Sequence, residues 1–101
     1  MDRIERITAM ERALSEGRNA TDQMQEAIAA LVDATDSISA LSAYYGSNDW
    51  YDDRRADERG KLPENLARGV LTEDEPYEVL VDAREAALGM LEVATSLLRA
   101  L

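Results

Sequence analysis

The sequence has no cysteine and no histidine among its 101 residues. Without cysteine there is no disulfide framework and no thiolate nucleophile. Without histidine the chain lacks the commonest metal ligand and the usual general base near neutral pH. Nucleophilic triads of the usual kinds are therefore excluded. We expect a protein that is not an enzyme and that uses no cofactor and no metal.

Long apolar runs are also missing. No uninterrupted stretch approaches the roughly 20 apolar residues of a membrane-spanning helix. The first twelve residues, MDRIERITAMER, alternate in charge and contain no apolar signal-peptide core. We therefore expect a cytoplasmic protein that does not bind a membrane.

Basic residues are scarce, with 11 Lys and Arg against 21 Asp and Glu, for a net charge of −10. Residues 1–20 balance four acids with four arginines, residues 21–45 hold four acids and no base, and residues 72–101 hold seven acids and two arginines. Direct binding to nucleic acid or to an anionic membrane needs clustered Lys and Arg, so neither is expected. The charge suits a basic protein partner, or simply keeps a small helical protein soluble.

Apolar or small residues that recur at spacings of three and four indicate a long helix over residues 2–45. Gly17 is its weakest point, because glycine costs roughly 1 kcal/mol relative to alanine inside a helix. Either one helix passes through Gly17, with or without a bend there, or a first helix ends near Glu16 and a second begins with Asn19 or Thr21 as its N-cap. The register is preserved across the glycine and favours one helix. The seam consists of Ile7, Met10, Leu14, Gly17, Thr21, Met24, Ile28, Leu31, Thr35, Ile38 and Tyr45.

A second long helix is predicted over residues 72–100. Thr72 and Glu75 have the spacing of a capping box, and Pro76 falls in the first turn, where its missing N–H matters little. An apolar seam then runs from Tyr77 to the end of the chain with helical spacing. No segment alternates with a period of two, so no sheet is expected.

Residues 46–71 form a connector that holds the only tryptophan and the only lysine. Gly46 suits the left-handed position that ends a helix, and Ser47 can then cap a short charged helix that Gly60 closes. Pro63 suits the start of a further turn or short helix. The expected fold is an all-α antiparallel hairpin of two long helices joined by this short-helix connector, in a single domain over residues 1–101.

A homodimer is expected from the length of the first helix. A straight helix of 44 residues would span roughly 66 Å. That length is too great for a compact monomer of 101 residues. Another copy of the chain should therefore cover part of the seam.

Three groups of residues are candidates for binding a partner. The first group consists of the aromatic residues around the start of the connector. These aromatic side chains could form a binding platform, or Trp50 and one tyrosine could plug the end of the hairpin against Leu62, Leu66 and Leu71. Arg68 could hold a phosphate or a partner carboxylate, or pair with a nearby acid such as Asp74 or Glu75. The aromatic group is Tyr44, Tyr45, Trp50 and Tyr51.

The third group is two rows of acids on the outer faces of the long helices, with no lysines four residues away to neutralise them. They could imitate a phosphate backbone toward a basic groove, or form a merely solvated surface. A further acidic cluster around Asp53 and Asp57 is interleaved with arginines, so we expect a solvated charged helix there rather than a cation site. The two rows are Asp22, Glu26, Asp33 and Asp36, and Glu78, Asp82 and Glu85.

Several motifs resemble a family of small bacterial proteins of about 100 residues that is classed as a domain of unknown function. They are Ile4-Glu5-Arg6-Ile7, Tyr44-Tyr45-Gly46-Ser47, Trp50, Gly60-Lys61-Leu62-Pro63, Leu66, Arg68-Gly69-Val70-Leu71 and Glu73-Asp74. The resemblance covers nearly the whole chain, and its specific part is the central 30 residues. It implies a bacterial origin, a helical fold and a single domain, and it implies no activity, substrate or cofactor.

For function, the sequence favours a small bacterial interaction or regulatory protein that binds another protein through the connector and the acidic faces. The alternative is an acidic inhibitor that imitates nucleic acid and blocks a basic nucleic-acid-binding protein, as anti-restriction and anti-CRISPR proteins do. A helical enzyme that uses metal-bound carboxylates would need acids facing inward between helices. The acidic rows predicted here face outward.

Overall fold

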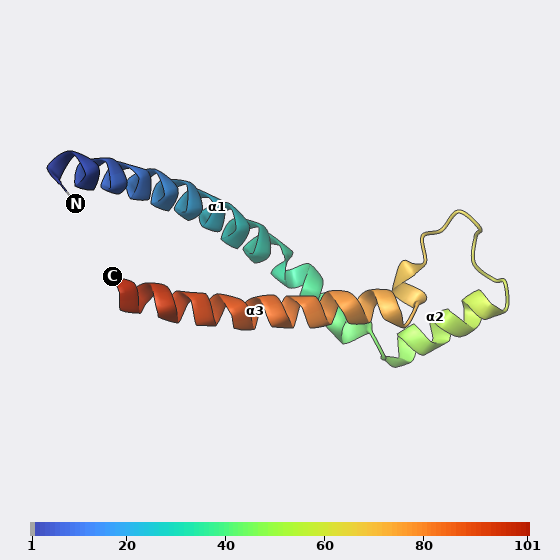
Figure 1. The fold of residues 1–101 in the computed structure, drawn as a ribbon. Helices are drawn as coiled ribbons and strands as arrows, with labels where there is room; N and C mark the ends of the chain where they lie inside the picture. Colours follow the sequence, from blue (N-terminus) through green and yellow to red (C-terminus); the bar gives the residue numbers. More distant parts are fainter. Residues whose placement is uncertain (1) are drawn as a thin grey trace. The chain divides into compact units, whose positions relative to one another are not determined.

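A computed structural model describes residues 2–101 as an all-α chain (Figure 1). The predicted fold class, two long helices joined by a short connector, is confirmed. The chain divides into two compact units, of which the first ends at Asp36 and the second covers Ser37–Leu101. Among the described residues, no helix combines the length and apolarity that crossing a bilayer requires. The elements in order are α1 (Arg3–Tyr44), α2 (Asn48–Glu58), the 3-10 turn η1 (Gly69–Leu71) and α3 (Asp74–Ala100).

The helix α1 runs without interruption through Gly17. Nine of its 42 residues are alanine, the strongest helix former, which offsets the cost of the glycine. A capping box fixes its N-terminus: the Glu5 N–H donates to Asp2 Oδ1 at 2.8 Å, and the Asp2 N–H donates to Glu5 Oε2 at 3.2 Å. The spacing of an aspartate and a glutamate three residues apart would have been enough to predict this cap.

The junction between α1 and α2 follows the predicted turn chemistry. Gly46 takes a left-handed conformation with φ of 79°, which glycine adopts without steric cost. The Ser47 N–H donates to the Tyr44 carbonyl at 2.9 Å. The Ser47 hydroxyl then accepts from the Trp50 N–H at 3.2 Å and caps α2.

The helix α2 ends in a Schellman motif around Gly60, whose φ is 68°. The Lys61 N–H donates to the Ala56 carbonyl at 3.0 Å, and the Gly60 N–H donates to the Asp57 carbonyl at 2.9 Å. These two bonds satisfy carbonyls that the end of a helix leaves without partners. They also turn the chain away from the helix axis into the loop.

The loop after α2 forms a turn rather than a helix at Pro63, whose carbonyl accepts from the Leu66 N–H at 3.2 Å. It leads into η1, and Thr72 follows. The Thr72 hydroxyl accepts from the Glu75 N–H at 3.3 Å, which is one of the two bonds of a capping box, and donates to the Gly69 carbonyl at 2.7 Å. The Thr72 N–H donates to the Gly69 carbonyl at 3.1 Å instead of to the Glu75 carboxylate. Thr72 is therefore the functional cap of α3, as predicted, although the regular helix begins at Asp74.

The core of the described chain is small and lies in the second unit. Trp50, Leu71 and Pro76 are its buried residues, from α2, η1 and the first turn of α3. The 3-10 turn packs against both α2 and α3. No residue of α1 is buried. The connector is thus a folded centre, whereas the apolar seams of both long helices remain open to solvent.

Candidate functional site

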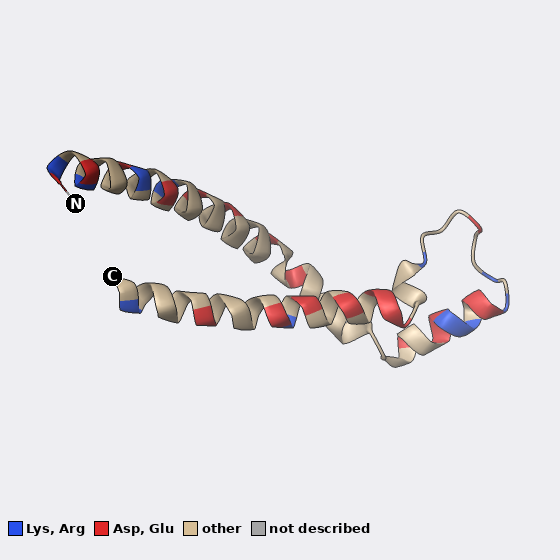
Figure 2. Ribbon diagram, viewed as in Figure 1, with Lys and Arg blue, Asp and Glu red and all other residues tan. Residues whose placement is uncertain are grey.

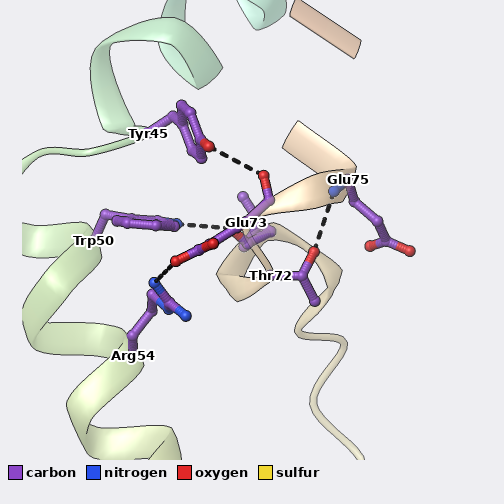
Figure 3. Close-up of polar contacts among 7 residues, drawn as sticks. Tyr45, Trp50, Arg54, Thr72, Glu73 and Glu75 are labelled. Atoms are coloured by element: carbon purple, nitrogen blue, oxygen red, sulfur yellow. Dashed lines mark hydrogen bonds and ion pairs between the residues drawn. The ribbon is translucent and has the colours of Figure 1, made fainter. Parts of the chain in front are cut away.

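Trp50 is the centre of the connector, with only 3% of its surface exposed. Its indole N–H donates to the Val70 carbonyl at 2.9 Å (Figure 3). The rings of Tyr45 and Tyr51 each meet the Trp50 ring edge to face, with centroids 5.0 Å away. This arrangement suits aromatic rings because the positive edge of one faces the negative face of another. Trp50 therefore joins the end of α1, the helix α2 and η1.

Glu73, just before α3, contacts Arg54 on α2 and Tyr45 at the end of α1 (Figure 3). The Arg54 guanidinium lies 4.6 Å from the centre of the Trp50 ring and pairs with the Glu73 carboxylate at 3.2 Å. The Tyr45 hydroxyl donates to the Glu73 carbonyl at 3.0 Å. These contacts hold the first turn of α3 against α2 and against the last turn of α1. Sequence spacing gives no sign of these contacts, because Arg54 and Glu73 are separated by the whole loop.

The Tyr44 hydroxyl donates to the Asp53 carboxylate at 2.5 Å. Partial burial of the phenol, the hydrogen bond to Asp53 and the nearby charges of Asp53 and Asp49 raise the pKa of Tyr44 to about 12. The neutral phenol is thereby favoured in the folded connector. Asp53, predicted to be a solvated acid, is a structural acceptor.

Arg68 binds the loop to α2. Its guanidinium pairs with the Asp57 carboxylate at 2.5 Å and also donates to the carbonyls of Pro63, at 2.6 Å, and Leu66, at 3.3 Å. Arg68 does pair with an acid, but with Asp57 rather than with Asp74 or Glu75, because the loop returns beside α2 before it reaches α3. A guanidinium with five donors can bridge a carboxylate and two carbonyls at once.

Most aromatic candidates have internal roles. Trp50 is buried, and the hydroxyls of Tyr44 and Tyr45 donate within the connector. Tyr51 differs, since 49% of its surface is exposed on α2. Trp50 is buried with Leu71 in the core of the connector, whereas Leu66 is 48% exposed and lies outside that core.

The acidic candidates are all exposed, and Figure 2 shows that acidic positions recur along α1 and α3. Three ion pairs are found among the described residues, all in the second unit, and none involves these acids. Their carboxylates are therefore available to a partner. The exposed acids are Asp22, Glu26, Asp33 and Asp36 on α1, and Glu78, Asp82 and Glu85 on α3.

The apolar seams are also exposed. Sequence periodicity locates such a seam but does not tell whether another helix covers it. On α3 the exposed side chains include Tyr77 at 57%, Leu91 at 66% and Leu98 at 73%. On α1 the seam contains a shallow hollow above Gly17. The hollow is lined by Ala13, Leu14, Gly17, Arg18, Thr21 and Asp22.

Comparison with known proteins places the chain in a family without assigning it an activity. No curated protein and no solved structure matches the sequence. A family model described as Domain of unknown function (DUF4298) matches residues 7–93, which agrees with the resemblance seen in the sequence. The chain therefore belongs to the DUF4298 family, a domain of unknown function.

Proposed function

We propose that this chain is a non-enzymatic interaction or regulatory protein of the bacterial cytoplasm, which binds another protein through the outer surface of α3. The observation that supports this function is the side-by-side exposure of apolar and acidic residues on that helix. Tyr77 and Leu91 are 57% and 66% exposed, and Glu78, Asp82 and Glu85 are exposed on the same helix.

The partner that fits this surface is a protein with an apolar patch bordered by Lys and Arg. Contiguous exposed apolar side chains bordered by polar residues are typical of interaction sites. The acids of α3 have no cation partner among the described residues, so a basic partner would not have to break an internal ion pair. Complementary charge would add association rate and specificity to the apolar contact.

The connector supports this function by fixing the first turn of α3. Arg54 and Tyr45 both bind Glu73, and Thr72 caps the helix that follows. A helix whose first turn is held in this way presents its side chains in a defined orientation. Such preorganisation lowers the entropy that binding must overcome.

A capture experiment with matched charge variants tests the proposal. The full chain is immobilised, bacterial lysate is applied at physiological and at high salt, and bound proteins are identified by mass spectrometry. The triple change E78K/D82K/E85K should abolish capture of a specific partner, whereas D22K/E26K/D33K, which changes charge by the same amount on α1, should not. Capture that is unaffected by the α3 variant, with helix content intact by circular dichroism, would contradict the proposal.

A second candidate is an inhibitor that imitates nucleic acid. Its support is the exposed row Asp22, Glu26, Asp33 and Asp36, in a stretch that holds no Lys or Arg from residue 21 to residue 45. Carboxylates about one helical turn apart could occupy a groove that binds phosphates. This function predicts capture of a basic nucleic-acid-binding protein that is lost at high salt and lost in D22K/E26K/D33K.

A further inference from the structure

We propose that α1 pairs with α1 of a second copy of this chain, in antiparallel orientation, with Gly17 and Thr21 beside the two-fold axis. The pairing goes beyond the proposed function, which uses α3. It involves residues of the first unit alone.

The seam of α1 is open along its length. Ile7, Met10 and Leu14 before the glycine are 55%, 60% and 53% exposed. The three that follow it, Met24, Ile28 and Leu31, are 41%, 46% and 36% exposed. Because the helix is continuous, these side chains form one stripe with a repeat of seven residues, the pattern that pairs helices.

The stripe is complementary to itself when reversed. The stripe consists of two interleaved series, one with Ile7 and Leu14 and the other with Met10 and Gly17. In an antiparallel pair, a residue of one series packs against a residue of the other series on the second helix. The register centred between Gly17 and Thr21 matches large side chains with large ones and small with small. Its layers are Ile7 with the second copy's Leu31, Met10 with its Ile28, Leu14 with its Met24, and Gly17 with its Thr21.

Charge selects the antiparallel orientation over the parallel one. A parallel pair would align residues 21–36, which hold four acids and no base, with the same segment of the second copy. The antiparallel pair aligns that segment instead with residues 2–17, where three arginines largely offset four acids. It also places Arg18 beside the second copy's Asp22, twice by symmetry, on one flank of the seam. Like charges across an interface are costly, whereas opposite charges set partner and orientation.

Small side chains permit a close approach on the other flank. Ala13, Ala20, Ala27 and Ala34 recur every seven residues beside the seam. Nothing lies within 4 Å of the position where Gly17 would carry a Cβ atom, and a hollow opens above it. The second copy's Thr21 fits this space.

Site-directed crosslinking tests both the pairing and its register, because the natural chain has no cysteine. Single cysteines are introduced by A13C, A20C and A27C in the full chain, and each is treated with a short bismaleimide at a concentration where light scattering shows a dimer. In the proposed register Ala20 lies about 3 Å along the axis from the second copy's Ala20, and Ala13 lies equally near the second copy's Ala27. Two copies of residue 13 would be roughly 18 Å apart along the axis.

The expected result is a covalent dimer from A20C alone and from an equimolar mixture of A13C and A27C, with little from A13C or A27C alone. Crosslinking by every single variant alike would show a parallel pair and overturn the proposal. A monomer in light scattering, or no crosslink from A20C and from the mixture, would overturn it too. Circular dichroism of each variant shows that the helix is retained.

Discussion

The indole N–H of Trp50 donates to the backbone carbonyl of Val70, 2.9 Å away, and so joins α2 to the 3-10 turn across twenty residues of sequence. A carbonyl at this place would otherwise lie beside a buried ring without a partner, which is costly. The bond thus fixes the path of the loop as well as the position of the ring. As the only tryptophan, Trp50 also provides a fluorescence signal specific to the connector.

Leu71→Ala should destabilise the connector by about 2–4 kcal/mol, the usual cost of emptying a buried leucine site. Leu71 is 9% exposed and belongs to the turn that packs between α2 and α3. Urea unfolding followed by Trp50 fluorescence measures the change. Leu66→Ala is the matched control, since Leu66 is 48% exposed and its change should cost less than about 1 kcal/mol. Equal losses from the two variants would contradict the described core.

Arg68→Ala should cost about 1–3 kcal/mol in the same assay, because Asp57 and two loop carbonyls lose a donor together. Arg68→Lys should recover only part of this, because an ammonium group cannot reproduce the planar fork. The control is Arg55→Ala, which removes an exposed pair with Asp52 and should change stability by less than about 0.5 kcal/mol. A loss for Arg55→Ala as large as that for Arg68→Ala would count against the bridging role.

The local features of the fold could be predicted from the sequence because each depends on residues only a few positions apart. Gly46, Ser47 and Thr72 end and begin helices by rules of backbone conformation and capping. The long seams are equally local, since helical spacing determines them. The capping box formed by Asp2 and Glu5 is also a local feature, and the spacing of these two residues predicts it.

The contacts that build the connector could not be predicted in this way. The partner of Arg68 depends on the path of the loop over residues 61–68, which has no periodicity. Only the three-dimensional path of the loop therefore shows that Arg68 pairs with Asp57 rather than with Asp74 or Glu75. Periodicity likewise cannot distinguish a seam covered by another helix from one left open, and for that reason the exposure of α1 and α3 emerged only from the structure.

Tyr44 should give the connector a dependence on high pH. Its pKa is raised to about 12 from the ordinary value of 10 by partial burial, the hydrogen bond to Asp53 and the charges of Asp53 and Asp49. The stability this phenol contributes is fully present below pH 10 and is lost as the pH rises toward 12. Wild type should therefore be more stable than Tyr44→Phe below pH 10, and the difference should shrink as the pH approaches 12.

Urea unfolding of both proteins across this range, monitored by Trp50 fluorescence, measures that difference. Tyr51→Phe is the control, because the Tyr51 hydroxyl has no hydrogen bond to another described residue and its ring is 49% exposed. Its removal should not alter the pH profile. A constant difference between wild type and Tyr44→Phe up to pH 12 would show that the phenol and Asp53 are not coupled.

Exchanging the charges of Arg18 and Asp22 tests the electrostatic part of the α1 pairing. Arg18→Glu should weaken the dimer, because each of two symmetric contacts then joins like charges, and Asp22→Arg should do the same. The double variant R18E/D22R should recover most of the loss, since it restores two opposite pairs. With roughly 0.2–1 kcal/mol for each exposed pair, the dimer dissociation constant should rise between twofold and thirtyfold in each single variant.

Sedimentation equilibrium at low and at high salt measures these constants. The difference between single and double variants should fade at high salt, where exposed charges are screened. The control Arg12→Glu changes charge by the same amount on the outer face of α1, away from the seam. Adding Asp22→Arg to this control should not strengthen the dimer. Losses in the single variants without recovery in the double variant would mean that Arg18 and Asp22 do not meet across the axis. The centre of the pairing would then lie elsewhere on the stripe.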